Sequence, residues 1–140
     1  MTGVYLDYNA SGLVRPEVLD AMTKALADNG NPSAVHAAGR RARARVETAR
    51  AQVGELVGAD PTAVVFNSGG TEANAQGIAS ALAGGCERLI VSATEHPCVA
   101  ETAANAGAPV EVLSVDENGV VDLDWLAEAL SRPGRAVVAI

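Results

Sequence analysis

The fold is decided by RLIVSATEHP, residues 88–97, an apolar run that leads into a polar turn and a proline. Ile90 and Val91 are β-branched and favour a strand, since their side chains pack well on a pleated surface. Pro97 suits the first turn of a helix, where its missing N–H leaves no hydrogen bond unmade. The stretch therefore predicts a strand over 88–92 and a helix over 97–106, with His96 at the mouth of that helix.

The same alternation of strand and helix continues on both sides of this stretch. Further strands are predicted at 63–66, 110–114 and 136–140, and further helices at 16–27, 33–57, 71–82 and 123–130. Near-continuous apolar strands separated by helices indicate parallel βα units. We therefore expect an α/β fold with a mainly parallel sheet and flanking helices, preceded by an extended N-terminal arm over residues 1–15. The run at 136–140 would be its fourth strand.

Composition excludes several classes of protein. With 49% hydrophobic and 19% charged residues in 140, the chain is not disordered. No apolar run reaches the roughly 18 residues of a membrane span, so no membrane association is expected. The N-terminus lacks the basic and apolar regions of a signal peptide, so we expect a cytoplasmic protein whose two cysteines, Cys86 and Cys98, are reduced.

Charge and metal-ligand patterns narrow the choice of partner. Five arginines lie within eleven residues, at positions 40, 41, 43, 45 and 50, while the net charge of the whole chain is −7. This acidic balance and the scarcity of aromatic residues argue against nucleic acid, and leave a solvated helix face or a subunit contact. Two cysteines and two histidines without metal-ligand spacing argue against a metal site.

Two turns follow predicted strands, where α/β sheets bind their ligands. The first is NSGGTEAN, residues 67–74, with two glycines before a helix. The free amides and dipole of that helix favour an anion such as phosphate, which the hydroxyl of Thr71 could also contact. The alternative is an ordinary turn in which Thr71 caps the helix.

The second turn contains His96 and Cys98. An imidazole there could stack on a flat cofactor or exchange a proton near neutral pH, or it could be a capping or surface histidine. Cys98 could be a nucleophile activated by the helix N-terminus, although a small, half-buried residue is the simpler interpretation.

Several stretches together resemble the N-terminal third of the cysteine desulfurase family, within the class V aminotransferase group of fold-type I pyridoxal phosphate enzymes. They are YLDYNA (5–10), PEVLDAM (16–22), GNPS (30–33), FNSGGTEAN (66–74), EHP (95–97) and VVDL (120–123). The resemblance implies that residues 16–140 form an incomplete large domain of the pyridoxal phosphate transferase fold, ending in its fourth strand.

The resemblance also implies roles for particular residues. Gly70 and Thr71 match the residues that hold the cofactor phosphate. His96 matches the histidine that stacks on the pyridine ring and takes part in proton transfer.

On the substrate side, the resemblance points to the arm. Asn9, Ala10 and Ser11 match the segment that lines the substrate, although Ser11-Gly12 stands where a threonine pair is more usual.

The implied reaction converts L-cysteine to L-alanine and leaves sulfur bound to the enzyme. It implies pyridoxal 5'-phosphate as cofactor, a homodimer, a sulfur-acceptor protein and a place in sulfur metabolism such as iron–sulfur cluster assembly. Alternatives are another class V enzyme, such as a selenocysteine lyase, or a non-catalytic fragment that acts as an interaction module. The one lysine, Lys24, lies outside any family motif, so we expect the 140 residues alone to be inactive.

Overall fold

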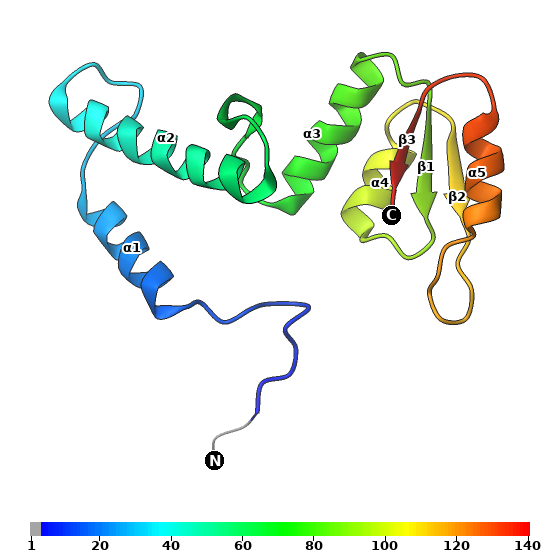
Figure 1. Ribbon diagram of the computed structural model, residues 1–140, viewed down its shortest axis with the longest axis horizontal. Helices are drawn as coiled ribbons and strands as arrows, with labels where there is room; N and C mark the ends of the chain where they lie inside the picture. Colours follow the sequence, from blue (N-terminus) through cyan, green and yellow to red (C-terminus); the bar gives the residue numbers. More distant parts are fainter. Residues whose placement is uncertain (1–3) are drawn as a thin grey trace. The chain divides into compact units, whose positions relative to one another are not determined.

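The computed structural model describes residues 4–140, which belong to two compact units, Met1–Val65 and Phe66–Ile140 (Figure 1). Each unit is described by itself. The first contains α1 (Pro16–Ala27), α2 (Ala37–Val57) and the short 3-10 helix η1 (Pro61–Ala63). The second contains α3 (Gly70–Ala83), β1 (Arg88–Ser92), α4 (Pro97–Ala104), β2 (Val110–Leu113), α5 (Leu123–Ser131) and β3 (Ala136–Ala139).

Local chemistry explains the bounds of the helices in the first unit. Pro16 opens α1, as expected. His36 caps α2, because its Nδ1 accepts a hydrogen bond from the amide of Gly39 at 3.3 Å. Gly58 ends α2 in the left-handed conformation, with φ of 67°, which glycine adopts without steric cost. An ion pair of 2.7 Å between Arg45 Nη2 and Asp28 Oδ2 joins α2 to the end of α1.

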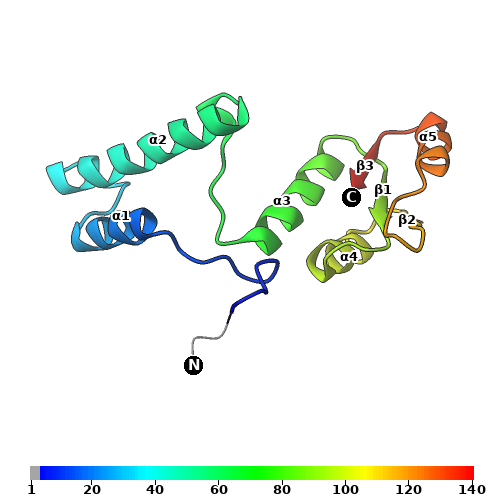
Figure 2. The same ribbon diagram turned by 60° about the horizontal axis from the view of Figure 1, so that its bottom comes forward.

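The second unit is a three-layer α/β arrangement. Its strands are all parallel, in the order β2-β1-β3, and Ile90 of β1 lies in register with Glu111 of β2 and Val138 of β3. Figures 1 and 2 show α4 and α5 on opposite faces of this sheet. The predicted α/β fold, with a parallel sheet and flanking helices, is confirmed.

Alternate residues of β1 build the two cores. Leu89 and Val91 face α3 and α4, where they pack against Ile78, Val99 and Ala103. On the other face, Ile90 packs with Leu113 and Ala129, and Trp125 and Leu126 of α5 lie against them. A two-residue period on a strand covered on both sides gives this division.

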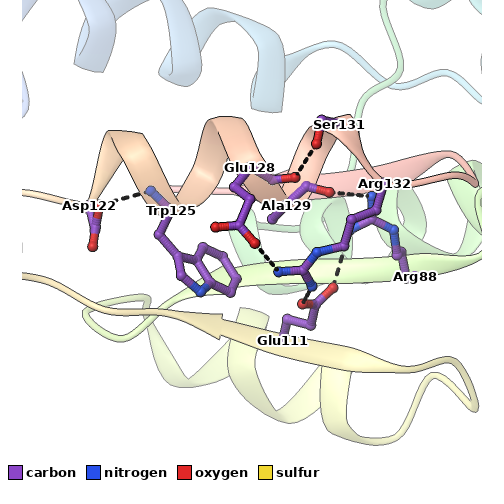
Figure 3. Close-up of polar contacts among 8 residues, drawn as sticks. All are labelled: Arg88, Glu111, Asp122, Trp125, Glu128, Ala129, Ser131 and Arg132. Atoms are coloured by element: carbon purple, nitrogen blue, oxygen red, sulfur yellow. Dashed lines mark hydrogen bonds and ion pairs between the residues drawn. The ribbon is translucent and has the colours of Figure 1, made fainter.

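A polar network joins α5 to the sheet (Figure 3). Arg88 donates through Nη2 to the carbonyl oxygen of Ala129 at 2.8 Å, and its Nη1 lies 3.1 Å from Glu111 Oε1. Arg132 reaches the other carboxylate oxygen of Glu111 at 2.6 Å, and its guanidinium lies 5.8 Å from the centre of the Trp125 ring. Glu111 therefore bridges the two arginines.

The strand expected at 63–66 is not formed. Asp60 Oδ1 accepts hydrogen bonds from the amide and the hydroxyl of Thr62, at 2.8 and 2.6 Å, which favours the 3-10 turn Pro61–Ala63. The backbone that follows is irregular, and Val65 and Phe66 are exposed. A strand requires a hydrogen-bonded neighbour, and the three-stranded sheet of the described residues does not include this segment. The strand at 136–139 is therefore third in the sheet, not fourth.

Two smaller expectations also change. The helix expected from residue 33 begins at Ala37, because Asn31 Oδ1 accepts from the amide of Ser33 at 2.9 Å and holds a turn there. The arm is not extended throughout: residues 8–10 form a turn, and the hydroxyl of Tyr5 lies 2.7 Å from the carbonyl oxygen of Asp7. Among residues 4–140, no helix is long and apolar enough to cross a membrane.

Candidate functional site

The mouth of α3 presents unpaired backbone donors. Its N-cap, Gly69, has no side chain to offer, and the first helical hydrogen bond runs from the amide of Ala73 to the carbonyl oxygen of Gly69 at 3.1 Å. Across the described residues, the amides of Gly70 and Thr71 and the Thr71 hydroxyl have no acceptor. Thr71 therefore does not cap the helix, and these exposed donors remain available to an anion.

Glu72 holds the turn that leads into α3. Its Oε2 accepts hydrogen bonds from the amide of Ser68 at 2.7 Å and from the Ser68 hydroxyl at 2.6 Å. These two bonds hold the pKa of Glu72 below its ordinary value, and the bond from the Ser68 hydroxyl has the larger effect. Glu72 was not among the residues that the sequence suggested, although the spacing of Ser68 and Glu72 is close to that of a capping box.

The mouth of α4 is closed by its own histidine. Nδ1 of His96 accepts a hydrogen bond from the amide of Cys98 at 3.1 Å, and Pro97 occupies the first helical position. Since Nδ1 accepts, the neutral ring carries its proton on Nε2. His96 therefore caps α4, which was one of the two interpretations of this residue. Because the residue is exposed, its ring and Nε2 can still contact a ligand.

Helices α3 and α4 begin on the same side of the second unit. Helices α3 and α4 run against the strands, so each begins on the side where β1 ends (Figures 1 and 2). Asn74, in the second turn of α3, donates through Nδ2 to Sγ of Cys98 in the first turn of α4 at 3.4 Å. The structure therefore places the starts of α3 and α4, at which Gly70, Thr71 and His96 lie, on the same side of the second unit, and the roles of these residues toward a ligand stay predictions.

The residues expected on the substrate side belong to the other compact unit. Asn9 and Ala10 lie in the exposed turn of the arm, and Ser11 follows it, with its amide bonded to the carbonyl oxygen of Asp7 at 3.2 Å. Their role toward a substrate stays a prediction.

Cys86 and Cys98 are both free thiols of intermediate burial. Within residues 4–140, no three metal-ligating side chains come together.

Comparison with known sequences supports one family. The family model "Aminotransferase class-V" matches residues 4–140. The cysteine desulfurase IscS of Dictyoglomus turgidum is 39% identical over 136 residues, which cover 92% of this chain and 34% of that protein. The cysteine desulfurase of Homo sapiens is 38% identical over 98% of this chain and 32% of its own length. The chain thus spans about a third of the length of these curated relatives.

Solved structures agree with the sequence comparison. A NifS-like protein from Rickettsia africae superposes with a TM-score of 0.82 at 31% identity, over 96% of this chain and 38% of that one. DndA from Streptomyces lividans gives a TM-score of 0.73 at 31% identity, over 96% and 40% of the two chains. Since the family model covers almost the whole sequence, the chain belongs to the class V aminotransferase family.

Proposed function

We propose that this chain is the N-terminal portion of a pyridoxal phosphate-dependent enzyme of the cysteine desulfurase type, and that it contributes phosphate-holding and ring-facing residues. The observation that carries the proposal is the open mouth of α3, with the unpaired amides of Gly70 and Thr71 on the same side of the second unit as the start of α4, where His96 lies (Figures 1 and 2). The cysteine desulfurases among its relatives give the reaction type.

The residues at this edge fit the proposed cofactor. A phosphate needs several donors that converge on one side, and the helix dipole adds to their attraction. A side chain added at Gly70 would meet no atom within 4 Å, so no described group fills the space on that side of the residue. Pyridoxal phosphate, when bound, withdraws electrons from an amino acid substrate.

His96 is suited to the ring of the cofactor and to a proton. Its Nδ1 is engaged with the amide of Cys98, which fixes the ring in one orientation at the mouth of α4. The residue is exposed, so its flat ring can stack on a cofactor, and Nε2 is the atom that would give or take a proton. Asn9, Ala10 and Ser11 would line the side on which L-cysteine binds.

The wider setting belongs to the same proposal. We place the protein in the cytoplasm, as a homodimer that passes sulfur from L-cysteine to an acceptor protein. Selenocysteine is the alternative substrate, since Ser11-Gly12 departs from the usual threonine pair. A non-catalytic role for the 140 residues alone is favoured by Lys24, which is paired with Asp20 at 2.6 Å in the exposed α1.

Calorimetry with two ligands tests the phosphate-holding role. Pyridoxal phosphate and pyridoxal differ only in the phosphate. The dissociation constant of pyridoxal divided by that of pyridoxal phosphate therefore isolates the contribution of the phosphate. We expect the phosphorylated ligand to bind at least about tenfold more tightly, and Thr71→Val to lower that ratio several-fold. Thr23→Val, which removes a similar hydroxyl from exposed α1, should leave the ratio unchanged. Equal affinities for the two ligands would contradict the proposal.

The ring-facing role needs a variant that keeps the helix cap. His96→Asn retains a side chain that caps well but loses the aromatic ring. We expect it to weaken both ligands by a similar factor and to leave their ratio intact, because the ring does not contact the phosphate. A variant that binds both ligands like the original chain would remove His96 from the site.

A further inference from the structure

Two glycines stand at the start of α3, Gly69 as its N-cap and Gly70 as its first residue. A side chain added at Gly69 or Gly70 would meet no atom within 4 Å. Gly69 is also the N-cap, so the side-chain hydrogen bond that usually orders this position is absent there. Glycine has the largest backbone freedom to lose, so this turn requires some other constraint to present its amides in one arrangement.

Glu72 supplies such a constraint from inside the helix. It lies in the first turn of α3, and its Oε2 takes both the amide and the hydroxyl of Ser68, at 2.7 and 2.6 Å. The two bonds span the segment from 68 to 72, which includes both glycines and Thr71. The residues with unpaired amides are therefore enclosed in a ring closed by one carboxylate.

The charge of Glu72 distinguishes two possible roles. A carboxylate in the first turn of a helix repels an incoming phosphate, so Glu72 cannot assist an anion by attraction. It can assist by ordering the turn before the ligand arrives, which reduces the entropy that binding must overcome. The two effects have opposite signs when the side chain is removed.

We infer that Glu72 is a positioning residue, which orders the turn at Ser68 so that the amides of Gly70 and Thr71 are arranged for a phosphate group. The inference rests on the proposed function, because it concerns the same phosphate. It assigns Glu72 no contact with the ligand.

Three variants and a control test this role in the purified chain. Glu72→Ala removes both the charge and the acceptor, Glu72→Gln keeps an acceptor without the charge, and Ser68→Ala removes one of the two donors. Glu101→Ala is the control, since it removes one exposed negative charge from α4 and no hydrogen bond of its side chain among the described residues. The measured quantity is the ratio of dissociation constants for pyridoxal and pyridoxal phosphate.

We expect Glu72→Ala to lower this ratio about tenfold, the effect of losing hydrogen bonds to a charged group. In Glu72→Gln the ratio should stay within about twofold of the wild-type value. Ser68→Ala alone should lower the ratio about threefold, and the double variant of Ser68→Ala and Glu72→Ala should have a ratio close to that of Glu72→Ala. The Glu101→Ala control should not change it. Rescue by glutamine separates ordering of the turn from charge.

An unchanged or raised ratio in Glu72→Ala would overturn the inference and leave the proposed function standing. A wild-type chain that binds both ligands alike would instead remove the proposed function, and the positioning role with it. If Glu72→Ala does not fold, as shown by fast amide exchange in β1, Ser68→Ala decides: a ratio equal to that of the wild type would overturn the inference.

Discussion

At the scale of single residues, the two helix mouths differ in how they are capped, and the difference decides what each can bind. His96 satisfies an amide of its own helix at 3.1 Å, so the mouth of α4 is already occupied. Gly69 satisfies none, so the mouth of α3 retains its donors. An anion is therefore expected to bind at the start of α3, and His96 would contact a ligand through its ring.

The carboxyl group of Glu72 should titrate below an ordinary glutamate. Hydrogen bonds from the Ser68 hydroxyl and amide stabilise its charged form and lower its pKa. Because the pKa is lowered in the folded chain, the contribution of this pair to stability is present above the ordinary pKa. It is lost as the pH falls through the lowered value. NMR titration of the side-chain carboxyl carbon measures this directly.

Ser68→Ala provides the matched comparison for that titration. It should raise the pKa of Glu72 toward the ordinary value, since the hydroxyl is the larger cause of the shift. It should leave Asp60, whose pKa is lowered by the hydroxyl and amide of Thr62, unchanged. A Glu72 that titrates normally in the wild-type chain would show that its hydrogen bonds to Ser68 are not formed in solution.

At the scale of elements, Glu111 adds an acidic bridge between the sheet and the end of α5 (Figure 3). Glu111→Ala should destabilise the second unit by about 1–3 kcal/mol, because it leaves the largely buried Arg88 without its carboxylate and also releases Arg132. The expected cost is below that of a fully buried pair, since Glu111 is 28% exposed. Urea denaturation followed by the fluorescence of Trp125 measures it.

Asp20→Ala is the control for this bridge. It removes the carboxylate that pairs with Lys24 at 2.6 Å, but both side chains are well exposed. The free energy of unfolding should change by no more than about 0.5 kcal/mol. Equal effects of the two substitutions would mean that Glu111 acts as an ordinary surface charge.

Elements defined by local signals could be predicted from the sequence, and those that depend on distant partners could not. Pro16, Pro97 and Gly58 mark helix ends through their own backbone properties, and each marks the end that was predicted. The strand at 63–66 failed because apolar composition alone does not supply a neighbouring strand. The starts of α3 and α4 share one side of the second unit because both helices run antiparallel to the strands (Figures 1 and 2). Glu72 was missed because the spacing of Ser68 and Glu72 is one residue longer than that of a capping box.

At the scale of the whole molecule, the burial of apolar side chains is uneven between the two units. Among the described residues, every buried hydrophobic side chain lies between Ile78 and Ala129, in the second unit. The first unit leaves Leu19, Met22 and Leu26 of α1 largely exposed. Since apolar burial is the main source of folding free energy, the second unit holds most of the stability.

Ile90→Ala should therefore unfold the second unit selectively. Ile90 is fully buried between the sheet and α5, and truncating such a side chain costs about 2–5 kcal/mol, a large part of the usual stability of a domain. Hydrogen exchange followed by mass spectrometry should show faster exchange in β1, β2 and α5, with α2 unchanged. Val35→Ala truncates a side chain that is 87% exposed in the first unit, and it should change exchange in neither unit. Faster exchange in α2 to the same extent would show that the two units unfold together. A substitution in the core of one unit can speed exchange in the other only if the two unfold cooperatively.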